Sequence, residues 1–254
     1  MNNFIWYNPT RILFGRGTHN EVGRETAAYS RRILLLYGGE SLKAAGTYGA
    51  ITKSLTEAGV EYRELGGVRP NPRLSLVRQG ISLCRREGMD FVLAAGGGSV
   101  IDTAKAIAAG VLYPGDVWDF YHTEKRPERV LPTGVVLTIP ATGSESSDGS
   151  VITREEENEK KSFCSPLLYP KFAILNPELC YTLPKRQIAA GSADILAHVM
   201  ERYFSPNGNT ELSDRLCEAA MKTIIHNAPL ALADPGRYEV WAELMWAGNV
   251  AHNG

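Results

Sequence analysis

Two residues in the last third of the chain have the types and the spacing for metal chemistry. Asp194 and His198 lie four residues apart in the stretch ADILAH, which has a helical pattern of apolar residues. Because four residues make just over one helical turn, both side chains would lie on the same helix face. A carboxylate oxygen and an imidazole nitrogen side by side could bind a metal ion, or they could be an ordinary polar surface pair. The sequence leaves both alternatives open, and for a metal the pair is only half of a ligand set.

A second candidate site lies where a short apolar run ends in three glycines. The run Phe91–Ala95 predicts a buried strand, Gly96–Gly98 predicts a tight turn, and Ser99 is expected to cap the following helix, with Asp102 at the spacing of a capping box. Glycines let the backbone approach a bulky anion, and a helix N-terminus offers free N–H groups. We therefore expect a pyrophosphate here, against the alternative of a turn without a ligand. The turn matches neither the Gly-x-Gly-x-x-Gly fingerprint nor a P-loop.

The elements that would position these residues alternate between strands and helices in the first two thirds of the chain. Apolar runs that end in glycines or hydroxyl-bearing residues occur within 31–46, 90–110 and 133–146. This alternation is typical of a parallel sheet with helices on its faces.

The last third of the chain has the apolar period of helices. Three such segments follow Pro184, and the second carries an apolar face formed by Leu212, Leu216, Ala220 and Ile224. We therefore predict an α/β domain over residues 1–184 and a helical domain over residues 185–254, with a ligand cleft between them.

Composition and charge exclude several classes of function. The chain has 254 residues, 44% of them hydrophobic, and a formal net charge of −1, so nothing favours nucleic acid or an anionic membrane as a partner. The four cysteines are scattered and indicate reduced thiols of a cytoplasmic protein. The N-terminus lacks the pattern of a signal peptide, and no apolar run approaches the roughly 20 residues that span a bilayer.

Six short motifs are together far more specific than any one of them. They are PTRILFG (9–15), PNP (70–72), GGGSVIDTAK (96–105), PATGSES (140–146), YTLP (181–184) and DILAH (194–198). In this order they resemble the iron-containing (group III) alcohol dehydrogenase family, and most closely its butanol dehydrogenase and broad-range aldehyde reductase branch. The resemblance implies a Rossmann-like N-terminal domain and an all-helical C-terminal domain. It also implies hydride transfer between NAD(P)(H) and a primary alcohol or aldehyde at an Fe²⁺ or Zn²⁺ site. A homodimeric assembly stays open.

The resemblance also implies a set of cofactor-binding residues. Gly97, Gly98 and Ser99 would hold the pyrophosphate, and Lys43 would be the partner of a 2′-phosphate. Glu40 stands where the NADP-preferring proteins carry a glycine, so NADP is favoured only narrowly over NAD. The full predicted set is Gly38, Gly39, Ser41, Lys43, Asn71, Gly97, Gly98, Ser99, Asp102, Thr138, Thr142, Ser147, Gly149, Lys160 and Leu179.

Asp194 and His198 match the first two metal ligands of the family, and by the same resemblance they are the catalytic residues. The other two ligands are histidines that follow the segment WAGNVAHNG, whereas this chain stops at Gly254. We therefore expect a C-terminally truncated chain with little dehydrogenase activity of its own, and exposed apolar helix faces that include Trp241, Leu244 and Met245. The alternatives are a non-catalytic dinucleotide-binding remnant and, less favoured because it leaves the glycine turn unused, a metal-dependent hydrolase.

Overall fold

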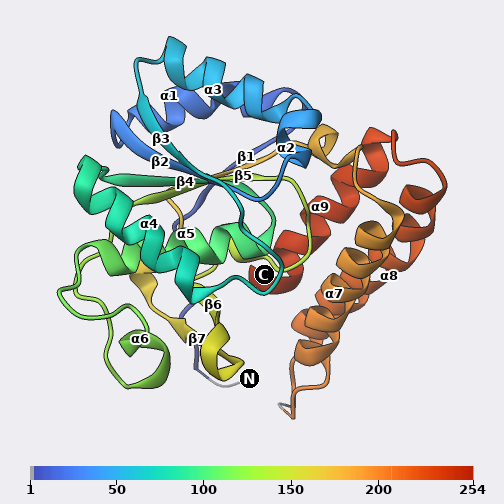
Figure 1. Cartoon of the computed structure of the whole chain (residues 1–254). Helices are drawn as coiled ribbons and strands as arrows, with labels where there is room; N and C mark the ends of the chain where they lie inside the picture. Colours follow the sequence, from blue (N-terminus) through green and yellow to red (C-terminus); the bar gives the residue numbers. More distant parts are fainter. Residues whose placement is uncertain (1–2, 207, 254) are drawn as a thin grey trace.

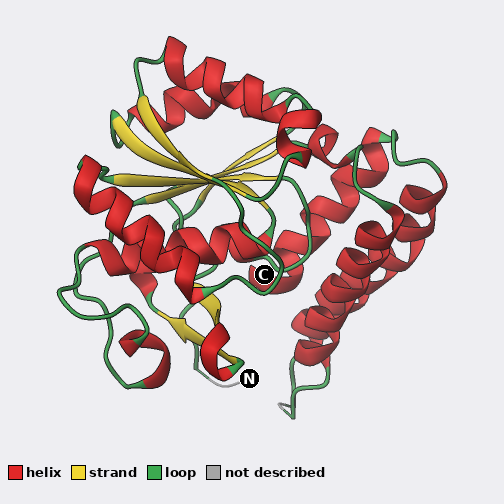
Figure 2. Ribbon diagram, viewed as in Figure 1, coloured by secondary structure: helices red, strands yellow, loops and turns green. Residues whose placement is uncertain are grey.

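Six segments pair into one sheet in which every strand is parallel to its neighbours (Figures 1 and 2). The computed structural model describes residues 3–206 and 208–253. The sheet has the order β1-β8-β5-β4-β2-β3. Its strands are β1 (Arg11–Phe14), β2 (Arg32–Tyr37), β3 (Glu61–Leu65), β4 (Phe91–Gly96), β5 (Thr133–Leu137) and β8 (Phe172–Leu175).

Helices cover both faces of this sheet, as the alternating sequence pattern predicts. Helices α1 (Val22–Ala27) and α3 (Thr47–Glu57) lie on one face, and α4 (Leu74–Glu87) and α5 (Gly98–Val111) lie on the other (Figure 1). Successive residues of a strand point to opposite faces, so in β2 the side chains of Leu34 and Leu36 join one apolar cluster and those of Ile33 and Leu35 join the other.

Shorter elements complete the α/β part. They are α2 (Ser41–Ala44), α6 (Asp119–His122), the antiparallel hairpin of β6 (Gly149–Arg154) and β7 (Glu159–Cys164), and the 3₁₀ turns η1 (Thr18–Glu21), η2 (Ser144–Ser146), η3 (Glu155–Glu157), η4 (Pro166–Leu168) and η5 (Pro177–Cys180).

Three long helices form the last part of the chain, as predicted. They are α7 (Lys185–Tyr203), α8 (Glu211–Ala233) and α9 (Tyr238–Asn253). Helix α9 runs between the sheet and the pair α7 and α8 (Figure 1), and it contacts both helices as well as η2 and η5. None of the helices in the described part of the chain is long and apolar enough to cross a membrane.

The expectation that Trp241, Leu244 and Met245 of α9 are exposed is wrong. Trp241, Leu244 and Met245 are all at most 2% exposed, because this face of α9 packs into the larger apolar cluster. The predicted apolar face of α8 is divided instead: Ile224 is buried, whereas Leu212 and Leu216 are exposed.

The strand order creates a site at the carboxyl edge of the sheet. The chain runs outward from β2 to β3, returns to β4 on the other side of β2, and then continues outward through β5 and β8. The connections that follow β2 and β4 therefore leave the sheet in opposite directions. In open α/β sheets a ligand binds in the crevice outside the carboxyl ends of two such strands.

We expect Gly23→Ala to lower the free energy of unfolding by ~1–3 kcal/mol, the typical cost of overpacking. An added Cβ would lie 2.0 Å from the carbonyl oxygen of Ser54, and backbone cannot move aside as a side chain can. The matched control is Gly49→Ala in α3, where no described atom lies within 4 Å of the added Cβ. Urea unfolding should show that the control is neutral or stabilised by up to ~1 kcal/mol; an equal loss in both variants would contradict the packing argument.

Candidate functional site

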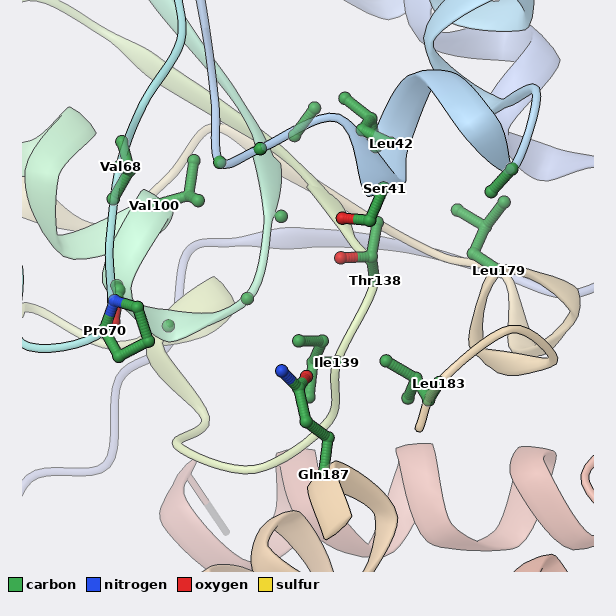
Figure 3. Close-up of a pocket in the computed structure, with 18 of the residues that line it drawn as sticks. Ser41, Leu42, Val68, Pro70, Val100, Thr138, Ile139, Leu179, Leu183 and Gln187 are labelled. Carbon is green, nitrogen blue, oxygen red and sulfur yellow. The ribbon is translucent and has the colours of Figure 1, made fainter. Parts of the chain in front are cut away.

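A pocket of about 350 Å³ lies at the carboxyl edge of the sheet. Five strands deliver residues to it through the connections that follow them: Gly38 after β2, Val68 after β3, Gly97 after β4, Thr138 after β5, and Leu179 after β8. Figure 3 shows the hydroxyls of Ser41 and Thr138 pointing into the cavity, from the connections that follow β2 and β5. The pocket is lined by Gly38, Gly39, Ser41, Leu42, Ala45, Thr47, Val68, Arg69, Pro70, Ala95, Gly96, Gly97, Gly98, Ser99, Val100, Thr138, Ile139, Ala141, Leu179, Thr182, Leu183, Pro184 and Gln187.

The glycine turn begins a helix at this pocket, but its cap differs from the prediction. Helix α5 starts at Gly98 with Gly97 as its N-cap residue, and no described side chain caps it. Ser99 therefore lies inside the first turn, and the predicted capping box with Asp102 is wrong. The first turn still directs its N–H groups and the positive end of the helix dipole toward the pocket. An added Cβ at Gly98 would lie 2.4 Å from Thr142 Oγ1, so glycine is needed for the close packing of the 138–142 connection.

Of the predicted cofactor-binding residues, eight line this pocket and seven do not. Those that line it are Gly38, Gly39, Ser41, Gly97, Gly98, Ser99, Thr138 and Leu179. Lys43, Asn71, Asp102, Thr142, Ser147, Gly149 and Lys160 lie outside its lining. Asn71 and Lys160 nevertheless meet, since Lys160 Nζ donates to Asn71 Oδ1 at 3.0 Å across 89 positions of sequence.

Lys43, which lies in α2, has aromatic and acidic neighbours. Its ammonium lies over the rings of Tyr37 and Tyr48, 5.5 Å and 5.4 Å from their centroids. Glu40 Oε1 lies 3.7 Å from Lys43 Nζ. The hydrogen bond to Tyr37 and the charge of Glu40 raise the pKa of Lys43. The charge of Lys43 is therefore partly balanced by a carboxylate of its own chain.

A fully buried ammonium lies behind the pocket. Lys105 has no exposed surface, and burial lowers its pKa to about 8, which leaves it protonated at neutral pH. Asp102, one turn earlier on α5, accepts a hydrogen bond from Ser144 Oγ at 2.7 Å. Burial raises the pKa of this carboxyl group, with Lys105 acting in the opposite direction.

Helix α9 contacts the same connection from the other side. Asn249 Nδ2 donates to Glu145 Oε1 at 2.8 Å and to Ser146 Oγ at 2.7 Å. Asn253 Nδ2 donates to Gly143 O at 3.0 Å. Glu145 is buried, and desolvation raises the pKa of its carboxyl group.

One face of α7 connects the pocket with the predicted metal ligands. Gln187 lines the pocket and points toward it from the start of α7 in Figure 3. Gly191, one turn later, packs so closely on Pro140 that an added Cβ would lie 2.9 Å from the Pro140 carbonyl oxygen. Asp194 and His198 continue this face by helical spacing.

Asp194 and His198 are suited to supply two ligands, half of the set that the family resemblance implies for a metal site. Their oxygen and nitrogen donors suit Fe²⁺ or Zn²⁺, and His198 Nδ1 is buried with no hydrogen-bond partner among the described residues. The ring of His252 lies 5.1 Å from that of His198, centroid to centroid. Within residues 3–206 and 208–253, no group of three or more His, Cys, Asp or Glu side chains could hold a metal ion.

Two stretches of the pocket lining were missed by the sequence analysis. Val68, Arg69 and Pro70 follow β3, and Thr182, Leu183 and Pro184 precede α7. The PNP and YTLP motifs overlap both stretches. The side chains of Val68, Pro70 and Leu183 carry no chemical signal in the sequence, and only the tertiary structure brings the two stretches to one cavity.

The chain matches two family models along nearly its whole length. The model described as iron-containing alcohol dehydrogenase matches residues 9–177, and the model of the C-terminal region of the same family matches residues 188–254.

Named relatives align with all 254 residues of the chain. A probable NADH-dependent butanol dehydrogenase 1 of Bacillus subtilis is 45% identical, and the NADPH-dependent aldehyde reductase YqhD of Escherichia coli is 40% identical. The chain covers 66% of each relative, so it spans about two thirds of their length. The crystal structure of an NADH-dependent butanol dehydrogenase A from Thermotoga maritima superposes with a TM-score of 0.97 at 42% identity, covering 100% of this chain and 64% of that one.

We expect Gly98→Ala to raise the Kd for NADH about tenfold, which corresponds to ~1.4 kcal/mol, because the added methyl group displaces Thr142 and the connection that lines the pocket. Fluorescence titration of NADH measures this effect. Thr142→Ala removes the clashing Oγ1, so Gly98→Ala should raise the Kd for NADH clearly less in a Thr142→Ala background. The same increase in Kd in both backgrounds would show that the contact with Thr142 does not cause the loss of affinity.

Proposed function

We propose that this chain, which belongs to the iron-containing alcohol dehydrogenase family, binds a nicotinamide dinucleotide in the pocket at the carboxyl edge of its sheet. We propose further that Asp194 and His198 supply two ligands of a divalent metal site. The whole protein would then transfer a hydride between NAD(P)(H) and a primary alcohol or aldehyde of the butanol type.

One observation carries this proposal: a single face of α7 runs from the pocket to both candidate ligands. Gln187 lines the pocket, and Asp194 and His198 follow on the same face within three helical turns. A cofactor that lies across the glycine turn would therefore end beside the metal ligands. Proximity of this kind is what hydride transfer requires, because the protein contributes mainly position and electrostatics to such a step.

The residues of the chain have separate tasks in this mechanism. The first turn of α5 accepts the pyrophosphate, and the hydroxyls of Ser41 and Thr138 face the cavity. Apolar side chains such as Val68, Ile139 and Leu183 exclude water from the bound cofactor. When bound, the metal supplies Lewis-acid polarisation of the substrate oxygen, and the nicotinamide supplies or accepts the hydride.

We propose NADH rather than NADPH as the preferred cofactor, which departs from the narrow preference for NADP in the sequence analysis. Glu40 lies beside Lys43 between two pocket-lining stretches, so a 2′-phosphate near Lys43 would meet this carboxylate. A carboxylate at this position suits a free 2′-hydroxyl, from which it can accept a hydrogen bond. The names of relatives include both NADH-dependent and NADPH-dependent proteins.

Glu40→Gln should lower the ratio of the Kd for NADPH to the Kd for NADH about threefold at low salt, since the side chain is exposed and solvent screens its charge. The matched control is Glu57→Gln, which removes another exposed carboxylate that pairs with a lysine, Lys53, on α3 away from the pocket. Fluorescence titration with both cofactors measures the ratio. An equal shift in the two variants, or none at Glu40, would refute the proposed role of Glu40.

The metal proposal is tested by calorimetric titration of the 254-residue chain with Zn²⁺ and, without oxygen, with Fe²⁺. We expect weak binding, because two protein ligands leave the coordination open to water. Asp194→Asn should abolish it while NADH still binds, and Asp234→Asn at the exposed end of α8 should have no effect. Binding that survives Asp194→Asn would remove the metal site from this proposal and leave the alternative, a dinucleotide-binding module without catalysis. Strong metal-dependent turnover by this chain would contradict the weak-binding expectation.

A further inference from the structure

The ammonium group of Lys105 has a hydrogen-bond acceptor for each of its three N–H donors. Its three N–H bonds face three backbone carbonyl oxygens, those of Ser144 at 2.7 Å, Ser147 at 2.8 Å and Gly149 at 3.0 Å. The hydroxyl groups of Ser144 and Ser147 are further neighbours, at 3.0 Å and 3.3 Å. A single buried side chain thus organises the backbone of residues 142–149, which we call the 142–149 segment.

The 142–149 segment connects the glycine turn with α9 and β6. At its start, Thr142 packs on Gly98 of the glycine turn and directly follows the pocket-lining Ala141. In its middle, Gly143, Glu145 and Ser146 accept hydrogen bonds from Asn249 and Asn253 of α9. At its end, Gly149 begins β6.

The charges around Lys105 explain why the ammonium can stay buried. The acidic groups that act on it are Asp102, Glu145 and Asp148. Asp102 also binds the segment directly, by accepting from Ser144 Oγ at 2.7 Å, and it accepts from the backbone N–H of Val151 in β6 at 3.3 Å. Two residues one turn apart on α5 therefore hold the segment, and α5 is the helix whose first turn faces the pocket.

We propose that Lys105 is a positioning residue for dinucleotide binding: it sets the backbone of the 142–149 segment so that the 138–142 connection closes against the glycine turn. This inference rests on the proposed function, because the consequence it assigns to Lys105 is affinity for NADH. Lys105 itself does not touch the cofactor, since it has no exposed surface.

The chemistry of lysine suits this role better than that of other side chains. An ammonium directs three N–H bonds around one point, whereas the guanidinium of arginine is a flat fork that suits carboxylates and phosphates. Methionine has a similar length but no donor, so three buried carbonyl oxygens would lose a charged partner. Such carbonyls are costly to leave unpaired, and the segment would relax toward water.

Lys105→Met in the 254-residue chain provides the test, with two readouts. Amide hydrogen exchange without ligand should rise in residues 142–149 and stay unchanged in β2 and α3. The Kd for NADH should rise about tenfold, as expected for the loss of a charged hydrogen-bonding group. The Kd for AMP, which would occupy only the Gly38–Ser41 end of the pocket, should change less than about twofold.

Ser54→Ala is the control for general destabilisation. Ser54 Oγ donates to Asn20 O at 2.6 Å and accepts from the Gly23 N–H at 3.0 Å, so its loss weakens α1 and α3, on the opposite face of the sheet from α5. It should lower the melting temperature without changing the ratio of the two Kd values. If Lys105→Met does not fold, Lys105→Gln, which keeps two donors, is the second variant. It should raise amide exchange in residues 142–149 and raise the Kd for NADH about threefold, with a smaller change in the Kd for AMP.

The outcomes separate the inference from the proposed function. Unchanged exchange in residues 142–149, or equal losses for NADH and AMP, would overturn the role of Lys105. A wild-type chain that does not bind NADH would overturn the proposed function and with it the link to affinity. The exchange measurement would then still decide whether Lys105 holds the segment.

Discussion

The buried ammonium of Lys105 is the constraint around which the pocket side of the molecule is arranged. Removing a charge from water costs several kcal/mol unless hydrogen bonds and opposite charges replace the lost hydration. Here the replacement comes from three carbonyl oxygens of one segment and from the carboxylates of Asp102 and Glu145. The segment must therefore pass close to α5, and the connection that precedes it must meet the glycine turn.

Helix α9 depends on the same segment from the opposite side. Its asparagines bind the carboxylate of Glu145 and the carbonyl of Gly143, while Trp241, Leu244 and Met245 fill the apolar cluster beneath the sheet. The start of α9 is also attached to the α/β part, since the guanidinium carbon of Arg16 lies 3.7 Å from the ring centroid of Tyr238. Helix α7 packs on α9, so the face that carries Asp194 and His198 is placed relative to the pocket through these contacts.

Small residues decide how closely the layers approach. Gly98 admits Thr142 beside the glycine turn, and Gly143, at φ 64°, leaves space for His252, whose Cβ would lie 2.2 Å from an added Cβ. Gly191 lets α7 approach the backbone of Pro140. Each of these glycines stands where the pocket side of the α/β part meets another element, and a methyl group at any of them would separate the elements.

The sequence by itself determined the local order of this protein: strands that end in glycine turns, helices after Pro184, and the pairing of Asp194 with His198 on one helix face. These features depend on neighbours within about one helical turn or one strand, so periodicity and turn residues report them. Tertiary structure alone decided what meets across the chain. It placed Asp102 on Ser144 rather than in a cap, joined Lys160 to Asn71, buried Lys105 among carbonyls, and covered the apolar face of α9. Those contacts join residues about 40 to 110 positions apart, and their partners follow from the strand order and the packing of layers, which no local pattern encodes.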